Sequence, residues 1–250
     1  MKETPFGVFC WGDNMKLIIS TFNIQNKYKI NKYNGIDKDG NHVKELIDLI
    51  NKNDIDILAT QELTRRFIKK LDIDLKANVV GKYRFKSIFN YIPDINKYNE
   101  TNSIITKHSI IYSKSKILPF LLDIPRIMTI ADIKINNRVF RVISTHLSHR
   151  NRKVRVKQLN KLYKEMIKRD NIILMGDFNM TTDDSDFKYF IDRIKDKYKR
   201  VDINKPTHNI KTKPIDHIFI PNSYRVISKN VLNIKERISD HKPIIVEIEI

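Results

Sequence analysis

The sequence predicts an α/β protein in which two stacked β-sheets form the core and helices cover the outer faces. Two observations lead to this fold class. Apolar runs of strand length outnumber segments with helical spacing, and several of these runs follow each other as hairpin-like pairs. The length of 250 residues, 41% of them hydrophobic, suits one large core, and no linker rich in proline, glycine or serine divides the chain.

In the first half of the chain, residues 16–22 and 55–60 are continuous apolar runs that we interpret as buried strands. Between them, apolar residues recur at helical spacing from 43 to 50, after Asn41, which is a suitable helix cap. A short helix is expected over 65–71. The polar loops that follow separate three further strands, expected at 85–92, 103–106 and 110–117.

In the second half, strands at 126–135 and 138–144 flank Asn136-Asn137, a dipeptide suited to the positive backbone angles of a hairpin turn. Apolar residues spaced three and four apart predict an amphipathic helix around 159–167. A strand at 171–175 follows it, and the same helical spacing recurs over 187–194. Apolar runs close the chain with strands at 215–220, 224–232 and 243–250.

Residues 1–14 differ from the rest, because they hold the single cysteine, Cys10, and the single tryptophan. Met15 then opens a run of strand character. We therefore treat 1–14 as a non-native or upstream extension and 15–250 as one domain.

One cysteine excludes an intrachain disulfide and a thiolate metal cluster. No apolar stretch reaches the ~20 residues of a membrane span and no secretion signal is recognisable, so we expect a cytoplasmic monomer.

Polar side chains stand where the apolar runs begin or end. The clearest case is Gly176-Asp177-Phe178-Asn179, which closes the run at 172–175. Each such residue alone has a structural explanation as a turn or cap residue. Together they have the composition of a hard-cation site with histidines beside it. The set comprises Asn23, Glu62, His146, Asp177, Asn179, Asp216, Asp240 and His241.

These residue types suit hydrolysis at phosphorus. Glu62, helped by Asn23 and Asp240, offers the oxygen ligands that Mg²⁺ prefers. Asp177 can polarise a water molecule while Asn179 holds it in line. The remaining groups are the two histidines and Asp216. His241 paired with Asp216 would have a raised pKa and favour the protonated ring, and His146 can donate to a non-bridging oxygen.

Six motifs in order resemble the endonuclease/exonuclease/phosphatase superfamily, and its compact bacterial members in particular. They are Thr21-Phe22-Asn23-Ile24, Gln61-Glu62-Leu63, Ser144-Thr145-His146-Leu147, Gly176-Asp177-Phe178-Asn179, Ile215-Asp216-His217-Ile218 and Ser239-Asp240-His241-Lys242-Pro243. The resemblance implies a four-layer, deoxyribonuclease I-like sandwich of two mixed sheets flanked by helices. It also implies phosphoester hydrolysis that depends on Mg²⁺ or Mn²⁺.

The resemblance further implies a role for each matching residue. Asn23, Glu62 and Asp240 lie on the metal side. His146 contacts the phosphate, Asp177 and Asn179 handle the water, and Asp216 braces His241. Smaller similarities are Arg126 before a strand, Arg155 and Gln158 after His146, and Pro206-Thr207 ahead of Asp216.

The substrate is indicated less directly. The chain carries a net charge of +18, which weakly favours a polyanion; a compositional bias, seen in the abundance of Lys, Ile and Asn, is the competing explanation. A basic run after His149 could follow a nucleic-acid backbone or be a solvated helix face; it comprises Arg150, Arg152, Lys153, Arg155 and Lys157. Aromatic and basic residues alternate over 85–98, where they could stack on bases or belong to the core.

We therefore expect a metal-dependent phosphodiesterase that acts on nucleic acid, as a nuclease or in processing of DNA ends. Its substrate-binding residues are expected to be Arg126, Arg150, Arg152 and Arg155. The alternative is a lipid or inositol-phosphate phosphodiesterase or phosphatase, similar to sphingomyelinases. An inactive binding module is the third reading, and it is disfavoured because every position of the catalytic set is filled.

Overall fold

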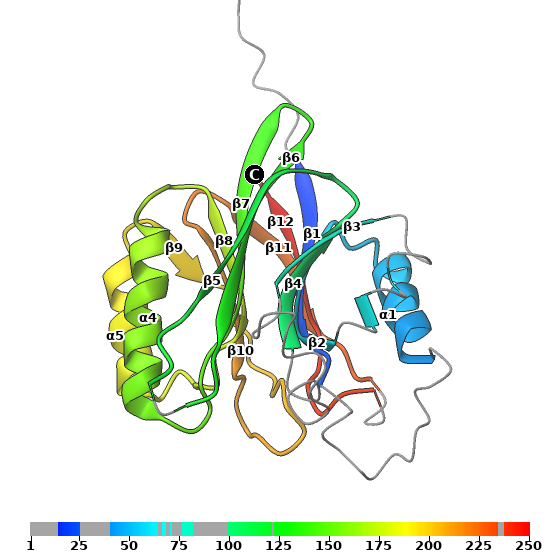
Figure 1. The fold of residues 1–250 in the computed structure, drawn as a ribbon. Helices are drawn as coiled ribbons and strands as arrows, with labels where there is room; N and C mark the ends of the chain where they lie inside the picture. The colour runs from blue at the N-terminus through cyan, green and yellow to red at the C-terminus, as the bar shows by residue number, and fades with distance from the viewer. Residues whose placement is uncertain are drawn as a thin grey trace, which may run out of the picture.

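A computed structural model describes residues 15–25, 41–64, 67, 68, 71, 77–82, 100–121, 123–234 and 238–250. In these residues, two six-stranded sheets pack face to face. Helix α1 (Asn41–Lys52) covers the outer face of one sheet, and α4 (Arg152–Met166) and α5 (Ser185–Ile194) cover the outer face of the other (Figure 1). The predicted four-layer sandwich is confirmed.

The first sheet has the strand order β11-β12-β1-β2-β4-β3. Its strands are β1 (Lys16–Asn23), β2 (Ile57–Thr64), β3 (Asn78–Val80), β4 (Glu100–Thr106), β11 (Arg225–Val231) and β12 (Ile244–Glu249). Only β1 and β2 run parallel, and α1 connects them. The other neighbours are antiparallel, so the sheet is mixed.

The second sheet has the order β5-β6-β7-β8-β10-β9. Its strands are β5 (Ser109–Ile117), β6 (Ile127–Ile135), β7 (Arg138–His146), β8 (Ile172–Asp177), β9 (Tyr198–Arg200) and β10 (Asp216–Pro221). Here β7 and β8 form the one parallel pair, connected by α4. The predicted hairpin about Asn136-Asn137 joins β6 to β7, and Asn136 has the expected positive φ of 52°.

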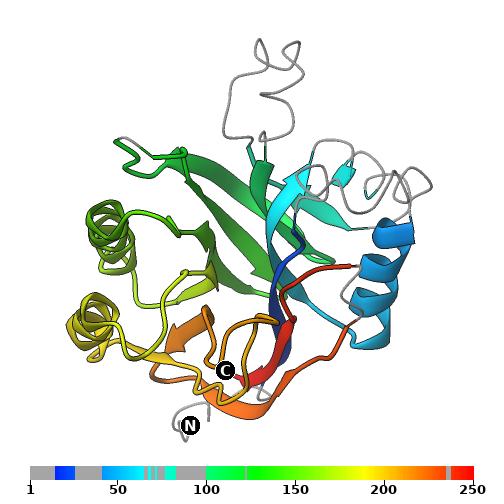
Figure 2. The same ribbon diagram turned by 90° about the horizontal axis from the view of Figure 1, so that it is seen from below.

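Three apolar clusters hold the layers together. The largest lies between the sheets and includes Ile19, Val142 and Ile218. A second fills the space beneath α4 and α5, and a third lies beneath α1. Figure 2 shows α4 and α5 side by side on one flank and α1 on the opposite flank. Most of the described apolar runs therefore face a neighbouring layer, whereas β5 leaves Ile111 and Ile117 exposed.

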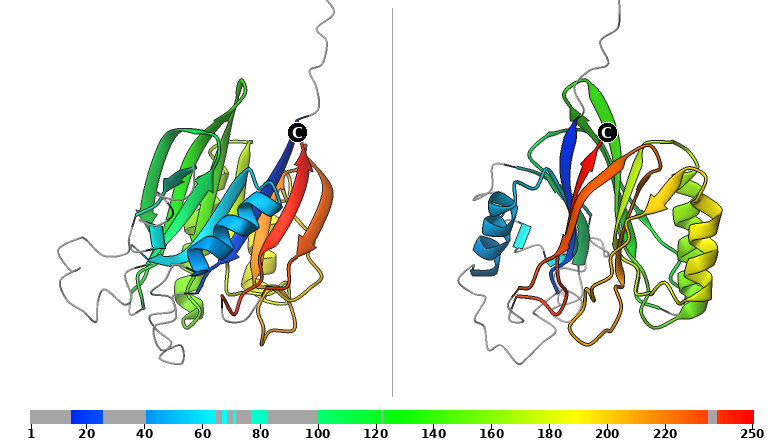
Figure 3. Two further views of the ribbon diagram at one scale, coloured as in Figure 1. Left: turned by 90° about the vertical axis from the view of Figure 1, so that its right-hand side faces the viewer. Right: turned by 180° about the vertical axis from the view of Figure 1, so that it is seen from behind.

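The two parallel pairs bring polar residues to one end of the sandwich. Because β1 and β2 point the same way, Asn23 and Gln61 end up opposite each other in the register. In the same manner β7 and β8 place His146 opposite Asp177. This end lies away from the β6–β7 turn, as the views in Figures 1 and 3 show. The sequence-predicted site residues converge there.

Several expectations differ from the structure in detail. The second strand begins at Ile57 and continues to Thr64 through a bulge between Thr60 and Leu63. The strands β3 and β9 were not predicted, because three residues are too few to show a period. The expected strand 85–92, the aromatic and basic segment 85–98, and residues 1–14 lie outside the described residues. The expected helix 65–71 is described only at 67, 68 and 71, which are helical.

Among the described residues, no helix is both long enough and apolar enough to cross a membrane.

Candidate active site

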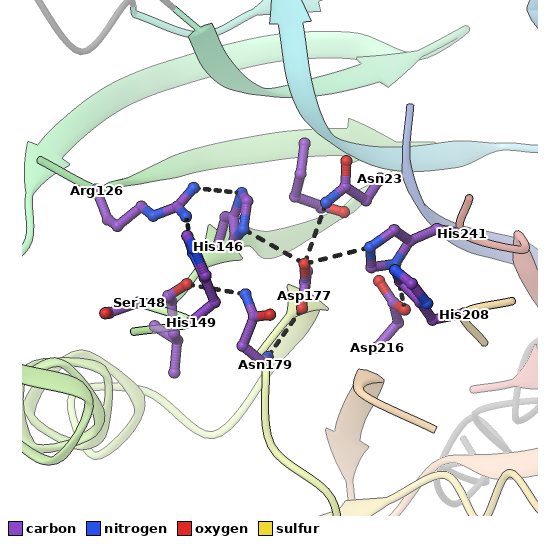
Figure 4. A network of polar contacts seen from close by, with 12 residues as sticks. Asn23, Arg126, His146, Ser148, His149, Asp177, Asn179, His208, Asp216 and His241 are labelled. Carbon is purple, nitrogen blue, oxygen red and sulfur yellow. Dashed lines mark hydrogen bonds and ion pairs between the residues drawn. The ribbon is translucent and has the colours of Figure 1, made fainter. Parts of the chain in front are cut away.

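Asp177, at the end of β8, is the centre of the polar network (Figure 4). Its Oδ2 accepts a hydrogen bond from Asn23 Nδ2 at 3.1 Å. The same oxygen lies 3.3 Å from His146 Nε2 and 3.7 Å from His241 Nε2. Its Oδ1 accepts from the backbone N–H of Asn179 at 2.8 Å. One carboxylate thus joins residues from both sheets.

Gly176 allows β8 to approach β7 closely at this point. Its φ is +151°, and a Cβ added there would lie 2.0 Å from the carbonyl oxygen of Thr145. Any other residue would push the two strands apart. The glycine therefore sets the distance between Asp177 and His146, which are partners in the β7–β8 register.

The surroundings of Asp177 favour its acting as a base. Burial raises its pKa to about 6, and the nearby charge of Asp216 adds to the effect, against the opposing influence of His241. A carboxyl group with a pKa close to neutral accepts a proton more readily than an ordinary aspartate does, yet is ionised at pH 7. The side chain of Asn179 donates to the carbonyl of Leu147 at 3.0 Å, which leaves its oxygen as an acceptor beside Asp177.

His241 and Asp216 form the expected dyad. Asp216 lies at the start of β10, and its Oδ2 is 2.9 Å from His241 Nδ1. Burial alone would lower the pKa of His241, but the charge and hydrogen bond of Asp216 outweigh it and, with Asp177 and Asp240, raise the pKa to about 10. His241 is therefore an imidazolium at neutral pH and directs Nε2–H toward Asp177.

Arg126 fixes the tautomer of His146. The buried guanidinium places Nη1 2.9 Å from His146 Nδ1 and Nη2 3.1 Å from His149 Nδ1. Because arginine can only donate, Nδ1 of His146 must accept, and the ring proton of the neutral form is on Nε2. His146 therefore presents an N–H to the centre of the site. Of the four arginines expected at the substrate, Arg126 is the one placed deepest in the site.

The other three arginines lie at the margin, around α4. Arg150 Nε is 3.0 Å from His149 Nε2. Arg155 Nη1 donates to the carbonyl of Ser148 at 3.1 Å. Arg152 turns toward α5 and pairs with Asp186, with Nε 2.6 Å from Oδ2. Each of these three cations thus has a protein partner.

The metal-side residues come from the first sheet and from the segment before β12. Glu62 lies on the β2 bulge with φ of 62°, and its charge acts on both Asp240 and His149. Asp240 Oδ2 accepts from Gln25 Nε2 at 2.5 Å, and its buried Oδ1 has no hydrogen-bond partner among the described residues. The oxygen of the third residue, Asn23, accepts from the Gln25 backbone N–H at 3.0 Å.

This donor set fits a hard divalent cation. Two carboxylates and an amide oxygen are the ligand types that Mg²⁺ takes, and a buried carboxylate oxygen without a donor is one that a cation would satisfy. Two clusters have ligand atoms within 4.8 Å of one another: His208 with Asp240 and His241, and Asp177 with Asp216 and His241. The first of them adjoins the metal-side residues.

Sequence reasoning missed three residues of the site: Gln25, His149 and His208. His208 Nε2 lies 3.5 Å from Asp240 Oδ2, while its Nδ1 accepts from the Ile210 backbone N–H at 3.2 Å. The neutral ring therefore carries its proton on Nε2 and donates toward Asp240. The sequence signal for His208 and His149 was their position next to predicted motifs: His208 follows Pro206-Thr207, and His149 follows the His146 motif.

A comparison with protein families matches residues 20–241 to the Endonuclease/Exonuclease/phosphatase family. A comparison with curated proteins finds no match. Among solved structures, an endonuclease/exonuclease/phosphatase family protein from Bacteroides thetaiotaomicron is 20% identical with a TM-score of 0.76, over 95% of this chain and 99% of that chain.

Two further structures have names that describe a substrate or product. The mannosyl-6-phosphatase Bt3783 of Bacteroides thetaiotaomicron is 19% identical with a TM-score of 0.73, over 93% of this chain and 99% of that chain. The TDP2 protein of D. rerio, complexed with single-strand DNA product, is 16% identical with a TM-score of 0.71, over 93% of this chain and 98% of that chain. At these identities the likeness concerns the fold, which is the deoxyribonuclease I-like sandwich expected from the sequence.

Proposed function

Because the chain belongs to the endonuclease/exonuclease/phosphatase family, we propose that it is a Mg²⁺-dependent phosphoester hydrolase that cleaves phosphodiesters of nucleic acid. The observation that carries the proposal is the environment of Asp177. A buried carboxylate with a pKa of about 6 lies between two histidines whose Nε2–H groups face it from opposite sides. That arrangement suits activation of water beside a phosphate group.

In the proposed mechanism, Asp177 takes a proton from the attacking water, and the oxygen of Asn179 orients that water in line with the scissile bond. The imidazolium of His241 and the Nε2–H of His146 donate to the non-bridging oxygens as negative charge builds up there. A Mg²⁺ ion held by Glu62 and Asp240, with Asn23 beside them, would neutralise charge on the phosphate. No covalent enzyme intermediate is required.

Three observations support nucleic acid as the substrate. The net charge of +18 favours a polyanion. Arg150 and Arg155 lie at the margin of the site, where they contact His149 and Ser148, and Arg152 at the start of α4 pairs with Asp186. The D. rerio relative in fold carries a single-strand DNA product, which is the kind of ligand we propose for this chain.

A second candidate is hydrolysis of a small-molecule phosphate ester, the class that includes the inositol-phosphate and lipid substrates. The Arg126 guanidinium and the Nε2–H of the neutral His146 beside it form a compact group of donors that would suit a terminal phosphate. The fold relative named as a mannosyl-6-phosphatase acts on such a group. We rank this candidate second, because it leaves the marginal arginines without a role.

A substrate panel tests both candidates. It compares plasmid DNA, single-stranded DNA, RNA, 5′-tyrosyl DNA, sphingomyelin, inositol phosphates, a sugar 6-phosphate and bis-p-nitrophenyl phosphate, in Mg²⁺ and in EDTA. The Asp177→Ala protein is the blank for contaminating activity. We expect Mg²⁺-dependent cleavage of nucleic acid that the blank lacks. Turnover confined to the phosphomonoesters or lipids would contradict the leading proposal and favour the second candidate.

A further inference from the structure

Helix α4 carries a row of lysines on its outer side. Lys153, Lys157, Lys161 and Lys164 fall within an arc of about 80° at 100° per residue, and the row is about 16 Å long. We call this row the α4 lysine stripe. Three of its members are exposed and Lys161 is half-buried. Among the residues that the structure describes, none of the four has an acidic partner.

The stripe differs from several lysines on nearby segments. These are paired with carboxylates, namely Lys116 and Lys168 with Glu165, Lys195 with Asp192, Lys197 with Asp170 and Lys213 with Asp183, whereas Lys114, Lys134 and Lys188, like the stripe, form no ion pair with a described residue. Glu165 is the only acidic residue within α4, and it is buried. The lysine abundance of the chain does not by itself explain a row from which carboxylates are missing.

The charge also opposes the helix dipole. The first turn of α4 has no acidic residue and contains Arg152 and Lys153, at the helix end where positive charge is unfavourable. An exposed cation in the first turn, such as Lys153, lowers the stability of a helix, while the charge of Arg152 is balanced by Asp186. Departures from local preference of this kind are typical of functional positions. The positive end of the dipole adds to the potential that an anion would meet there.

A stacked aromatic group lies next to the stripe, where α5 packs against α4 (Figure 2). The guanidinium Cζ of Arg193 is 3.5 Å from the ring centroid of Tyr163 and 5.5 Å from that of Tyr189. Arg193 Nη1 also donates to Asn160 of α4 at 2.6 Å, which fixes the stack in place. Tyr189 is 65% exposed, so most of its surface is open to a ligand.

The stripe begins at the catalytic end of the sandwich. Helix α4 starts three residues after His149, and Gln158 accepts from the backbone N–H of Ser148 at 2.8 Å. From there the lysines lead away from Asp177 along the outer surface. A chain of phosphates that passes the site would therefore have a row of cations to follow.

We infer that the α4 lysine stripe and Tyr189 form a second, non-catalytic binding surface for single-stranded nucleic acid, with phosphates on the lysines and a base stacked on the tyrosine. Single strands suit it because every base offers a face for stacking, whereas bases in a duplex are already stacked. The inference rests on the proposed nucleic-acid substrate and adds to it a place where the strand is held outside the site.

The test is binding of a fluorescent single-stranded oligonucleotide in EDTA, over a range of salt concentrations. The stripe variant carries Lys→Gln at 153, 157, 161 and 164. The matched control carries Lys→Gln at 44, 52, 82 and 134, where the lysines are also exposed. It removes the same amount of charge from other parts of the surface. Four lost phosphate contacts should reduce the slope of log K against log salt by about 3, at about 0.7 per contact. Tyr189→Ala should weaken binding at least about fivefold.

Hydrolysis of bis-p-nitrophenyl phosphate should be unchanged in the stripe and Tyr189 variants, since none of the altered residues contacts a catalytic residue among those described. Equal losses of affinity and slope in the stripe and control variants would overturn the inference, because net charge would then explain binding. The inference would also be overturned if the unaltered protein bound anionic phosphatidylserine vesicles but did not bind the oligonucleotide. Failure of the catalytic proposal is detected separately, as Mg²⁺-dependent hydrolysis that survives in Asp177→Ala.

Discussion

Replacing Asp216 by Asn should move both limbs of the pH–rate profile to lower pH. The unaltered protein needs Asp177 ionised and His241 protonated, so kcat/KM should rise as the pH passes about 6 and fall as it passes about 10. The charge of Asp216 raises the pKa of both groups. Its removal should therefore lower both values, while the Asn oxygen can still accept from His241 Nδ1–H.

The size of the shift follows from the contact distance. Asp216 Oδ2 is 2.9 Å from His241 Nδ1, which places the centres of charge about 4 Å apart. At an effective dielectric constant of about 20, this interaction contributes about 4 kcal/mol, equivalent to about 3 in the pKa. The alkaline limb should then fall from about 10 to roughly 7. At pH 8 the variant would keep about a tenth of its active form.

The assay is kcat/KM for bis-p-nitrophenyl phosphate between pH 5 and 11 at saturating Mg²⁺. Asp170→Asn is the control, because Asp170 is exposed and precedes β8 at the end remote from the site. The Asp216→Asn protein should regain activity on acidification, and the control should follow the unaltered profile. An alkaline limb that stays near 10 while only the amplitude falls would refute the assigned role of the dyad.

Three other changes test separate parts of the site. Gly176→Ala should destabilise the protein by roughly 2–5 kcal/mol in urea unfolding, because its Cβ would meet the backbone of Thr145; an unchanged midpoint would contradict this. Glu62→Gln should raise the Mg²⁺ concentration for half-maximal activity, and an unchanged titration would remove Glu62 from the metal side. His208→Ala should weaken Mg²⁺ binding about tenfold or more, because Asp240 loses its contact with His208, and kcat at saturating Mg²⁺ should be preserved. Calorimetry measures the Mg²⁺ affinity, and a metal titration of activity gives kcat. A fall in kcat without a change in Mg²⁺ affinity would count against a role for His208 in positioning Asp240.

The parts of the site predictable from the sequence are those at the ends of long apolar strands. Asp177 follows a four-residue apolar run, and its position at a sheet edge could be inferred from that run alone. His146 and Asp216 are placed by the same logic at the ends of β7 and β10. Burial of an apolar strand is a local demand, so its sequence signal is strong.

The rest depended on contacts between distant segments. Gln25 reaches Asp240 across 215 residues, and nothing near either residue indicates the pairing. Arg152 pairs with Asp186 only because α4 and α5 pack together. The positive φ of Glu62 follows from the bulge where β2 slips against β4, a register effect that the residue type does not reveal.

The position of β1 in its sheet has a consequence for how the protein is made. This strand lies between β2 and β12, and β12 is the last strand along the chain. During synthesis, one edge of β1 therefore stays unpaired until β12 has been made, and an unpaired strand edge promotes aggregation. Asn23 at the end of β1 also accepts, through its carbonyl, from Ser239 beside the Asp240–His241 pair. Assembly of the catalytic groups thus requires β12 to pair with β1, and hydrolysis should begin only once that pairing has formed.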